Sequence, residues 1–300
     1  MNTPEWCQYL QLFADLGADA FRHVKSKHAL RKFCVIVEPR QHPNLIPVIK
    51  NFMRLMPSGW GLIVYHGPEN ERFVKNGLSH ALSDDQVYYV RMARRNLTPA
   101  EYSAMLGDPI FWQCLLDGFK CEHALIFQCD TLLLKGGNAV DAWLKYDYVG
   151  APWPNMSVSI AACKRELQLT VGNGGLSLRN VRVMLDIARH YPYPGDAGVH
   201  VPEDVYFSYW LKWNEAVYWT PRGDEATAFA VEHVCNPDAL GVHAPSVDVS
   251  DIIQNAIERH TEENIFKNPF KGLPTINSIQ TKPIQTTPND INHNQEGNRD

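Results

Sequence analysis

The chain has 300 residues, 45% of them hydrophobic, which is enough to bury the core of one large domain or two small ones. Its formal net charge of −5 argues against a nucleic-acid partner, and no apolar run approaches the roughly 20 residues of a membrane-spanning helix. Because the N-terminus lacks a basic region followed by an apolar stretch, and the seven cysteines include no CxxC pair, we predict a cytoplasmic protein with reduced thiols.

The first half of the chain alternates strand and helix patterns. Residues 33–37 form an apolar run typical of a buried strand, and residues 45–56 show helical spacing of their apolar side chains. Another helix is expected to begin with Thr98 as its N-cap and Pro99 in its first turn. This alternation predicts an α/β fold, a single Rossmann-like domain whose mostly parallel central sheet is covered by helices and binds ligands at the carboxyl ends of its strands. The other predicted strands are residues 59–67, 86–92 and 123–130.

From Tyr148 onward the pattern changes to short extended runs interspersed with helices, which predicts an α+β second half. No Pro/Ser/Gly-rich linker separates the halves, so we predict one domain over residues 1–267, with halves at about 32–135 and 136–267. Residues 268–300 are rich in Asn, Gln, Thr and Pro and are predicted to be a disordered tail. The expected extended runs are residues 147–153, 174–180, 215–221 and 227–235, and the expected helices are residues 182–191 and 203–213.

The predicted strand ALIF ends in QCD, residues 128–130, at the expected binding edge of the sheet. An Asp at this place can hold a divalent cation that bridges phosphate oxygens, and an acidic protein needs such a cation to bind a diphosphate. The alternative is that Asp130 only begins a turn or caps the next element.

Three glycines stand within four positions of GNGGLSLRN, residues 172–180. A phosphate-binding P-loop would need Lys and then Ser or Thr after its glycines, and the Rossmann spacing GxGxxG is also absent. Two interpretations remain. The missing side chains either leave room for a flat or bulky ligand such as a sugar ring, or form a tight turn between strands.

Three further motifs each have a chemical and a structural interpretation. Glu203 and Asp204 follow Pro202 at the start of an expected helix, where acids stabilise the helix dipole but where a carboxylate facing a cleft could also act as a general base. His243 is more often a packed or solvent-facing residue than a ligand, although His can bind a metal beside an Asp. Trp153 could offer its face to an acceptor sugar or fill the core.

The order of these motifs resembles that of the GT-A fold glycosyltransferases, which have a DxD motif, a glycine loop, an xED motif and a C-terminal His. More narrowly, LIFQCD, DYVGAPW, VGNGGLSLR and PEDVYFS resemble the signature of a poorly characterised glycosyltransferase-like family found in viruses, bacteria and eukaryotes. The resemblance covers residues 32–244. It implies a hexosyltransferase-type enzyme whose first half binds a nucleotide sugar, UDP- or GDP-linked, and whose second half binds a glycan or other hydroxyl acceptor.

The resemblance also implies roles for individual residues. Asp130 matches the second carboxylate of DxD and, with His243, would bind Mn²⁺ or Mg²⁺ and the donor's diphosphate. Gln128 stands in place of the first carboxylate, a departure that bears on metal dependence. Asp204 matches the general base, with Glu203 as the second candidate, and transfer would invert the anomeric configuration. The expected donor-binding residues are Val37, Glu38, Arg40, Gln128, Asp130, Asn173, Gly174 and Gly175.

Two other functions stay open at this point. Gln128 favours a catalytically inactive module that binds a nucleotide sugar or a glycan. A metal-dependent phosphoester hydrolase would use Asp130, Asp204 and His243 with a metal-bound water, although a two-metal site has a richer ligand set.

Overall fold

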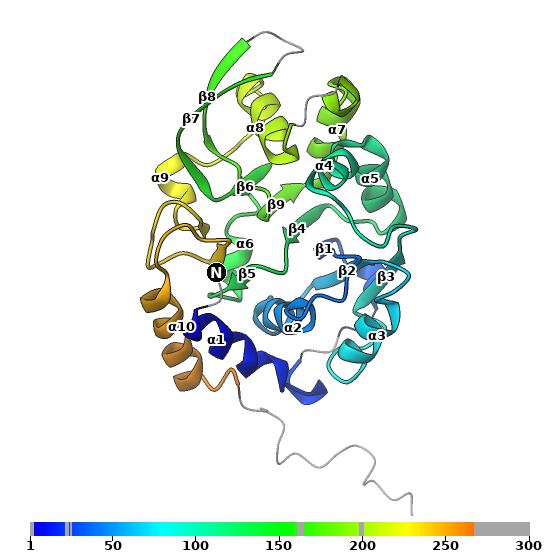
Figure 1. The fold of residues 1–300 in the computed structure, drawn as a ribbon, viewed down its shortest axis with the longest axis vertical. Coiled ribbons are helices and arrows are strands. Elements are labelled where there is room, and N and C mark those ends of the chain that lie inside the picture. Colours follow the sequence, from blue (N-terminus) through cyan, green and yellow to red (C-terminus); the bar gives the residue numbers. More distant parts are fainter. Residues whose placement is uncertain (1–2, 22–23, 25, 161–164, 198–200, 267–300) are drawn as a thin grey trace, which may run out of the picture. The chain divides into compact units, whose positions relative to one another are not determined.

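In the computed structural model, which describes residues 3–266 except 22–23, 25, 161–164 and 198–200, the largest element is a six-stranded sheet in the order β3-β2-β1-β4-β9-β6 (Figure 1). Strand β1 pairs in parallel with β2 and β4, and β2 with β3, whereas β9 runs antiparallel to both β4 and β6. The sheet is therefore mixed, and the prediction of a mostly parallel sheet is not confirmed. The strands are β1 Lys32–Val37, β2 Trp60–His66, β3 Val87–Arg91, β4 His123–Phe127, β6 Tyr148–Gly150 and β9 Leu176–Asn180.

Both faces of this sheet are buried, each in its own core. Successive side chains of a strand point to opposite faces, so one strand contributes to both cores. Cys34 and Ile36 of β1 belong to one core, and Phe33 and Val35 belong to a second. Helices α1, α2, α3 and α10 contribute to the first core, and α4, α5, α7 and α8 to the second, which confirms that helices flank the sheet (Figure 1). These helices are α1 Pro4–Ala14, α2 Leu45–Leu55, α3 Glu71–Ser79, α4 Pro99–Gly107, α5 Pro109–Gln113, α7 Val181–His190, α8 Glu203–Trp213 and α10 Ser250–Glu262.

The start of α4 confirms the predicted cap. The Thr98 hydroxyl accepts a hydrogen bond from the Glu101 backbone N–H at 3.2 Å, and the Glu101 carboxylate accepts from the Thr98 N–H at 2.9 Å. This reciprocal arrangement satisfies two backbone donors and fixes where the helix begins. Shorter helices elsewhere are α6 Asn138–Asp141, α9 Gly223–Ala226, the 3₁₀ helices Ala18–Ala20, Lys27–Ala29 and Pro194–Ala197, and the π-helical turn Cys114–Gly118.

A second, three-stranded sheet, in the order β10-β11-β5, begins directly after the predicted QCD motif. Strand β4 ends at Phe127, three residues before the predicted end, and β5 follows after a turn that contains Asp130. Strand β5 pairs antiparallel with β11, and this register places His243 opposite Thr131. The pairing therefore brings the late His to the end of β4. The remaining strands are β5 Thr131–Leu133, β10 Ala230–Val231, β11 Gly241–His243, and the pair β7 Pro152–Ile160 and β8 Arg165–Val171.

Some sequence predictions for the second half were wrong. Residues 215–221 form turns and irregular backbone instead of a strand, and residues 227–235 contain only the two-residue strand β10. The β-branched and aromatic side chains that suggested a strand, such as Val217 and Trp219, are 69% and 66% exposed. Helices α1 and α10 were not predicted. The predicted tail at residues 268–300 lies outside the described residues.

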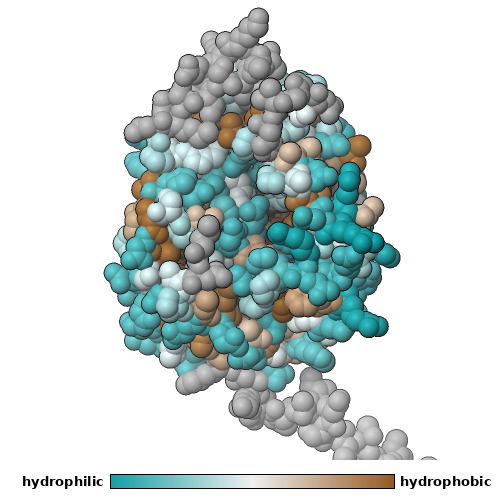
Figure 2. Space-filling view, in the orientation of Figure 1, coloured by the Kyte–Doolittle hydropathy of each residue, from teal (hydrophilic) through white to brown (hydrophobic). Residues whose placement is uncertain are grey.

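The surface of the described unit carries both signs of charge. Figure 2 shows hydrophilic side chains gathered on the side where α3 and β3 lie. Exposed ion pairs in this region join Lys75 and Arg91 to Glu71, and Arg95 to Glu69, at 2.8 to 3.8 Å. Such pairs contribute little to stability in water. None of the described helices is long and apolar enough to cross a membrane.

Candidate functional site

A cavity of about 520 Å³ opens at the carboxyl ends of β1 and β4, where the sequence pattern predicted a ligand site. This volume falls in the usual range of small-molecule pockets, about 300–1,000 Å³. Five separated segments and one side chain from β11 build its wall, so the site exists only in the folded chain. The lining consists of residues 37–40 with His42, residues 96–99 with Tyr102 and Ser103, residues 128–130, residues 173–175, residues 202–204, and His243.

All but one of the residues predicted for the site line this one cavity. The exception is Trp153, which is 8% exposed and packs in a small apolar cluster with Leu169 and Val205. One member of this cluster, Val205, follows Asp204 in the chain, but the ring of Trp153 does not line the cavity. The residues brought together are Val37, Glu38, Arg40, Gln128, Asp130, Asn173, Gly174, Gly175, Glu203, Asp204 and His243.

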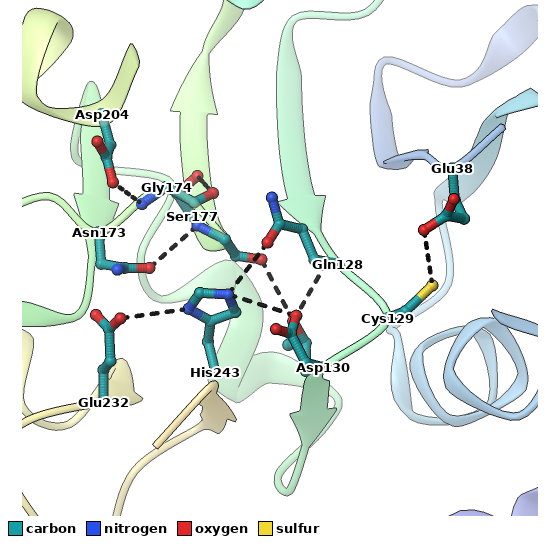
Figure 3. Close-up of polar contacts among 12 residues, drawn as sticks. Glu38, Gln128, Cys129, Asp130, Asn173, Gly174, Ser177, Asp204, Glu232 and His243 are labelled. Atoms are coloured by element: carbon teal, nitrogen blue, oxygen red, sulfur yellow. Dashed lines mark hydrogen bonds and ion pairs between the residues drawn. The ribbon is translucent and has the colours of Figure 1, made fainter. Parts of the chain in front are cut away.

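His243 lies at the centre of a polar cluster at the end of β4 (Figure 3). Its Nε2 atom is 3.5 Å from a carboxylate oxygen of Asp130 and 3.2 Å from the side-chain oxygen of Gln128. Its Nδ1 atom faces Glu232, whose nearest carboxylate oxygen is 3.8 Å away. This distance is too long for a hydrogen bond, but the carboxylate lies behind the second ring nitrogen, where carboxylates commonly orient a metal-binding His.

The charges of this cluster alter the titration of its two carboxyl groups. Burial raises the pKa of Asp130, but the hydrogen bond and the charge of His243, together with weaker contributions, outweigh burial and leave this pKa lowered. Burial is also the largest influence on Glu232 and raises its pKa, while His243 and His233 oppose it. At neutral pH, Asp130 is therefore an ionised carboxylate facing the cavity.

The three atoms of Asp130, Gln128 and His243 have the spacing of neighbouring ligands around one cation. Two ligands at right angles and about 2.1 Å from an ion are about 3 Å apart, close to the 3.2 and 3.5 Å found here, which are also the distances of a hydrogen bond and an ion pair. Among the described residues, however, no group of three or more His, Cys, Asp or Glu side chains could hold a metal ion. Asp130 and His243, with the Gln128 oxygen, would therefore supply only part of the ligands of a cation, and phosphate oxygens and water would have to supply the rest, as is common for Mg²⁺.

Asp204 lies in the first turn of α8, on the other side of the glycine segment from His243 (Figure 3). One carboxylate oxygen accepts a hydrogen bond from the Gly174 N–H at 3.1 Å, and the other accepts from the Val205 N–H at 2.7 Å. Burial and the neighbouring carboxylate of Glu203 raise the pKa of Asp204 to about 6, although the two backbone hydrogen bonds and Arg179 oppose the shift. A carboxyl group with a pKa near neutrality suits proton transfer.

Glu203, the second predicted catalytic residue, forms an ion pair with Arg179. Its two carboxylate oxygens accept hydrogen bonds from the Arg179 guanidinium at 2.6 and 2.9 Å, and both side chains are buried. The rings of Trp112, Tyr148 and Phe207 surround the guanidinium, with centroids 4.8 to 5.7 Å away. Glu203 therefore holds the start of α8 against β9, and Asp204 is the carboxylate left to face the cavity.

The glycine segment is a turn between β8 and β9 that packs against the side chains of the site itself. A Cβ atom at Gly174 would collide with Glu203, and one at Gly175 would collide with the imidazole of His243. Gly172 has a φ of +138°, which residues with a side chain rarely adopt. The segment is therefore the turn of the second interpretation, and the groups packed against its glycines are the protein's own Glu203 and His243; the approach of a ligand stays a prediction.

Glu38 and Arg40 form the wall of the cavity at the end of β1. Arg40 donates two hydrogen bonds through its guanidinium to the buried carboxylate of Glu38, both at 2.8 Å. The guanidinium stays 56% exposed at the mouth of the cavity, which leaves N–H donors free to bind an anion. The thiol of Cys129 also points to Glu38, at 3.8 Å.

Sequence reasoning missed the segment that precedes and begins α4. Asn96, Leu97, Thr98, Tyr102 and Ser103 line the cavity, but no motif marks them. The capping signal located the helix start correctly, and only the packing of α4 against α8 brings that start to the site. His42, Cys129 and Pro202 were also missed, as was Glu232, which lies behind His243.

Comparison with known proteins places the chain in a family without an assigned function. Residues 86–243, more than half of the chain, match the family described as "Protein of unknown function (DUF5672)", and the chain belongs to this family. The matched region contains every site residue from Asn96 to His243 and excludes the end of β1. No curated protein matches the chain.

A solved structure with a similar arrangement is the 4-diphosphocytidyl-2C-methyl-D-erythritol synthase from Anaerococcus prevotii DSM 20548. The similarity covers 62% of this chain and 83% of that one, with 11% sequence identity and a TM-score of 0.37. These values are too low to assign a function.

Proposed function

We propose that this protein is a metal-dependent glycosyltransferase that moves a sugar from a nucleotide-sugar donor, UDP- or GDP-linked, to a hydroxyl acceptor. The observation that carries the proposal is the set of side chains that line one and the same cavity. Asp130, His243 and Gln128 form a cation-compatible cluster on one side, and Asp204, with its pKa near 6, lies on the other. Sugar transfer from a diphosphate needs both kinds of group, one at the leaving group and one at the acceptor.

In the proposed reaction Asp204 is the general base. Its carboxylate takes the proton of the acceptor hydroxyl while the acceptor oxygen bonds to the anomeric carbon. The bond from that carbon to the diphosphate oxygen breaks, and its electron pair leaves with the nucleoside diphosphate through a transition state of oxocarbenium character. Approach from the face opposite the leaving group would invert the anomeric configuration.

The donor's diphosphate is assigned to the cluster at the end of β4. Asp130 and His243, with the Gln128 oxygen, would hold Mn²⁺ or Mg²⁺, which when bound stabilises negative charge on phosphate oxygens. Arg40 lines the same cavity with a half-exposed side chain and would bind the same negative charge. The nucleoside is assigned to the end of β1, at Val37 and Glu38.

A module that binds nucleotide sugars or glycans without catalysis is the second candidate. Gln128 in place of a carboxylate, and the lack of a three-residue cluster of metal-binding side chains among the described residues, favour it. It shares the binding site with the enzyme, so only a transfer assay separates the two.

The first experiment is a thermal-shift screen of the purified protein with UDP-, GDP-, CMP- and dTDP-sugars, with and without Mn²⁺. A ligand that binds only the folded state raises the melting temperature. A Mn²⁺-dependent shift with one class of donor is expected. If no donor produces a shift, the proposed donor site is wrong.

Two variants then test the assigned roles. Asp130→Ala should weaken donor binding in the presence of Mn²⁺ by at least about tenfold and should have little effect without it. Asp204→Asn should abolish transfer while the donor-induced shift persists. Transfer by Asp204→Asn at the wild-type rate would exclude this residue as the base, and donor binding without transfer by the wild-type protein would favour the binding module.

A further inference from the structure

Tyr102 of α4 lines the cavity with a hydroxyl group that the reaction outlined above does not use. The hydroxyl oxygen is buried and has no hydrogen bond of normal geometry to any residue that the structure describes. Buried polar atoms in folded proteins are nearly always hydrogen-bonded, and each exception calls for an explanation, such as a functional role. Two fully buried tyrosines of the core follow the rule. Tyr9 donates to the Leu133 carbonyl at 2.7 Å and Tyr148 to the Gly172 carbonyl at 2.6 Å.

The surroundings of this hydroxyl locate it between the two functional ends of the cavity. Burial raises the pKa of Tyr102 most, and the carboxylates of Glu203 and Asp204 add to the increase. The side chain of Gln128 opposes it by approaching the hydroxyl as a hydrogen-bonding group, although not with the distance and angle of a normal hydrogen bond. Asp204 belongs to the acceptor end and Gln128 to the diphosphate end. The hydroxyl lines the same cavity as both of these side chains.

The proposed function, on which this inference rests, predicts which part of the donor lies beside this hydroxyl. The anomeric carbon must lie between the acceptor oxygen at Asp204 and the diphosphate oxygen at Asp130. The group that fills the space between these ends is the sugar being transferred. The nucleoside, in contrast, is assigned to the end of β1.

We infer that Tyr102 is a sugar-binding, specificity-determining residue, whose hydroxyl forms a hydrogen bond with a hydroxyl group of the donor's sugar. A tyrosine hydroxyl both donates and accepts, as a sugar hydroxyl does. The ring is held in place, because α4 begins at the capping box of Thr98 and packs against α8. A site that hydrogen-bonds a substrate hydroxyl discriminates strongly against analogues that lack it.

The test uses Tyr102→Phe, which removes one oxygen atom and keeps the ring. The matched control is Tyr9→Phe, at a residue that does not line the cavity and whose hydroxyl has a partner in the folded protein. The melting temperature of each full-length variant is measured alone, with Mn²⁺ and a nucleoside diphosphate, and with Mn²⁺ and the corresponding nucleotide sugar.

The inference expects three results. Without ligand, Tyr102→Phe melts at or above the wild-type temperature, whereas Tyr9→Phe melts lower, because only Tyr9 loses a hydrogen bond on substitution. The affinity of Tyr102→Phe for the nucleoside diphosphate equals that of the wild type. Its affinity for the nucleotide sugar falls roughly threefold to tenfold, and one deoxy-sugar analogue, which lacks the contacted hydroxyl, binds the variant and the wild type equally.

Other results would overturn the inference. A loss of stability in ligand-free Tyr102→Phe like that of Tyr9→Phe would mean that the hydroxyl has a structural partner. Equal loss of affinity for the nucleoside diphosphate and the nucleotide sugar would place Tyr102 at the nucleotide. Unchanged affinity for both would remove the residue from donor binding while leaving the proposed function intact. If the wild type binds no nucleotide sugar, the proposed function fails and the assignment of Tyr102 fails with it.

Discussion

The raised pKa of Asp204 makes the stability of this protein depend on pH in a way that one substitution should abolish. The folded-state pKa is about 6, against an ordinary value of 3.8. Because the folded state holds this proton more tightly than the unfolded state, the group stabilises the fold below pH 3.8 and loses that stabilisation as the pH rises through about 6. The full difference of about 2 pKa units corresponds to about 3 kcal/mol.

Asp204→Asn removes the titrating group and keeps the size of the side chain. Between pH 4.5 and 7.5 the wild type should lose about 2 kcal/mol of unfolding free energy that the variant does not lose. Urea denaturation at several pH values measures both proteins, and the difference between them cancels all other titrating groups. The exposed Asp85, in the turn before β3, provides the matched control as Asp85→Asn.

A constant difference between Asp204→Asn and the wild type across this pH range would refute the reasoning. It would mean that the carboxyl group of Asp204 is well solvated and that its two backbone hydrogen bonds balance the cost of burial. The assignment of Asp204 as general base requires the rate of sugar transfer to rise as the pH increases through about 6. A solvated Asp204 with an ordinary pKa would give no such rise.

Three further predictions concern the packing of the fold. Gly175→Ala should push the His243 imidazole aside, destabilise the protein by about 1–3 kcal/mol and weaken Mn²⁺-dependent donor binding, as measured by urea denaturation and thermal shift; normal binding would contradict the close packing. Glu203→Gln should leave the buried Arg179 charge without its partner and cost about 3–5 kcal/mol of unfolding free energy, whereas a near-neutral effect would show that water reaches the pair. Burial lowers the pKa of His260 to about 4, so the unfolding free energy of the wild type should fall by about 2 kcal/mol when the pH is lowered from 7.5 to 5, and that of His260→Phe should not show this loss. Equal pH profiles of the two proteins in urea denaturation would disprove this.

Part of the site was predictable because its signals are local. The apolar strand that ends before Asp130, the acids that begin α8 and the glycines of residues 172–175 are each visible in a few consecutive residues. The rule that ligands bind at the carboxyl ends of parallel strands then predicted the edge of the sheet at which the cavity opens. The same local pattern placed β1 and α2 correctly, since burial on both faces and helical spacing leave clear periodic signals.

Strand direction was not predictable in this way. An apolar run is equally consistent with a parallel and an antiparallel neighbour, so the antiparallel course of β9 could not be seen in GGLSLRN. The same limit explains the false strand at residues 215–221, whose composition favours extended backbone but which finds no strand to pair with.

The sequence by itself determined which elements form and which chemical groups are available, because propensity, capping and periodicity act over a few residues. Only the tertiary structure decided how those groups meet. The antiparallel pairing of β5 with β11 sets His243 beside Asp130, and the ion pair of Glu203 with Arg179 leaves Asp204 as the carboxylate that faces the cavity. Packing of α4 against α8 adds Tyr102, which no motif marked. These contacts join residues far apart in the chain, and their free energy depends on burial and distance in three dimensions, which no short stretch of sequence contains.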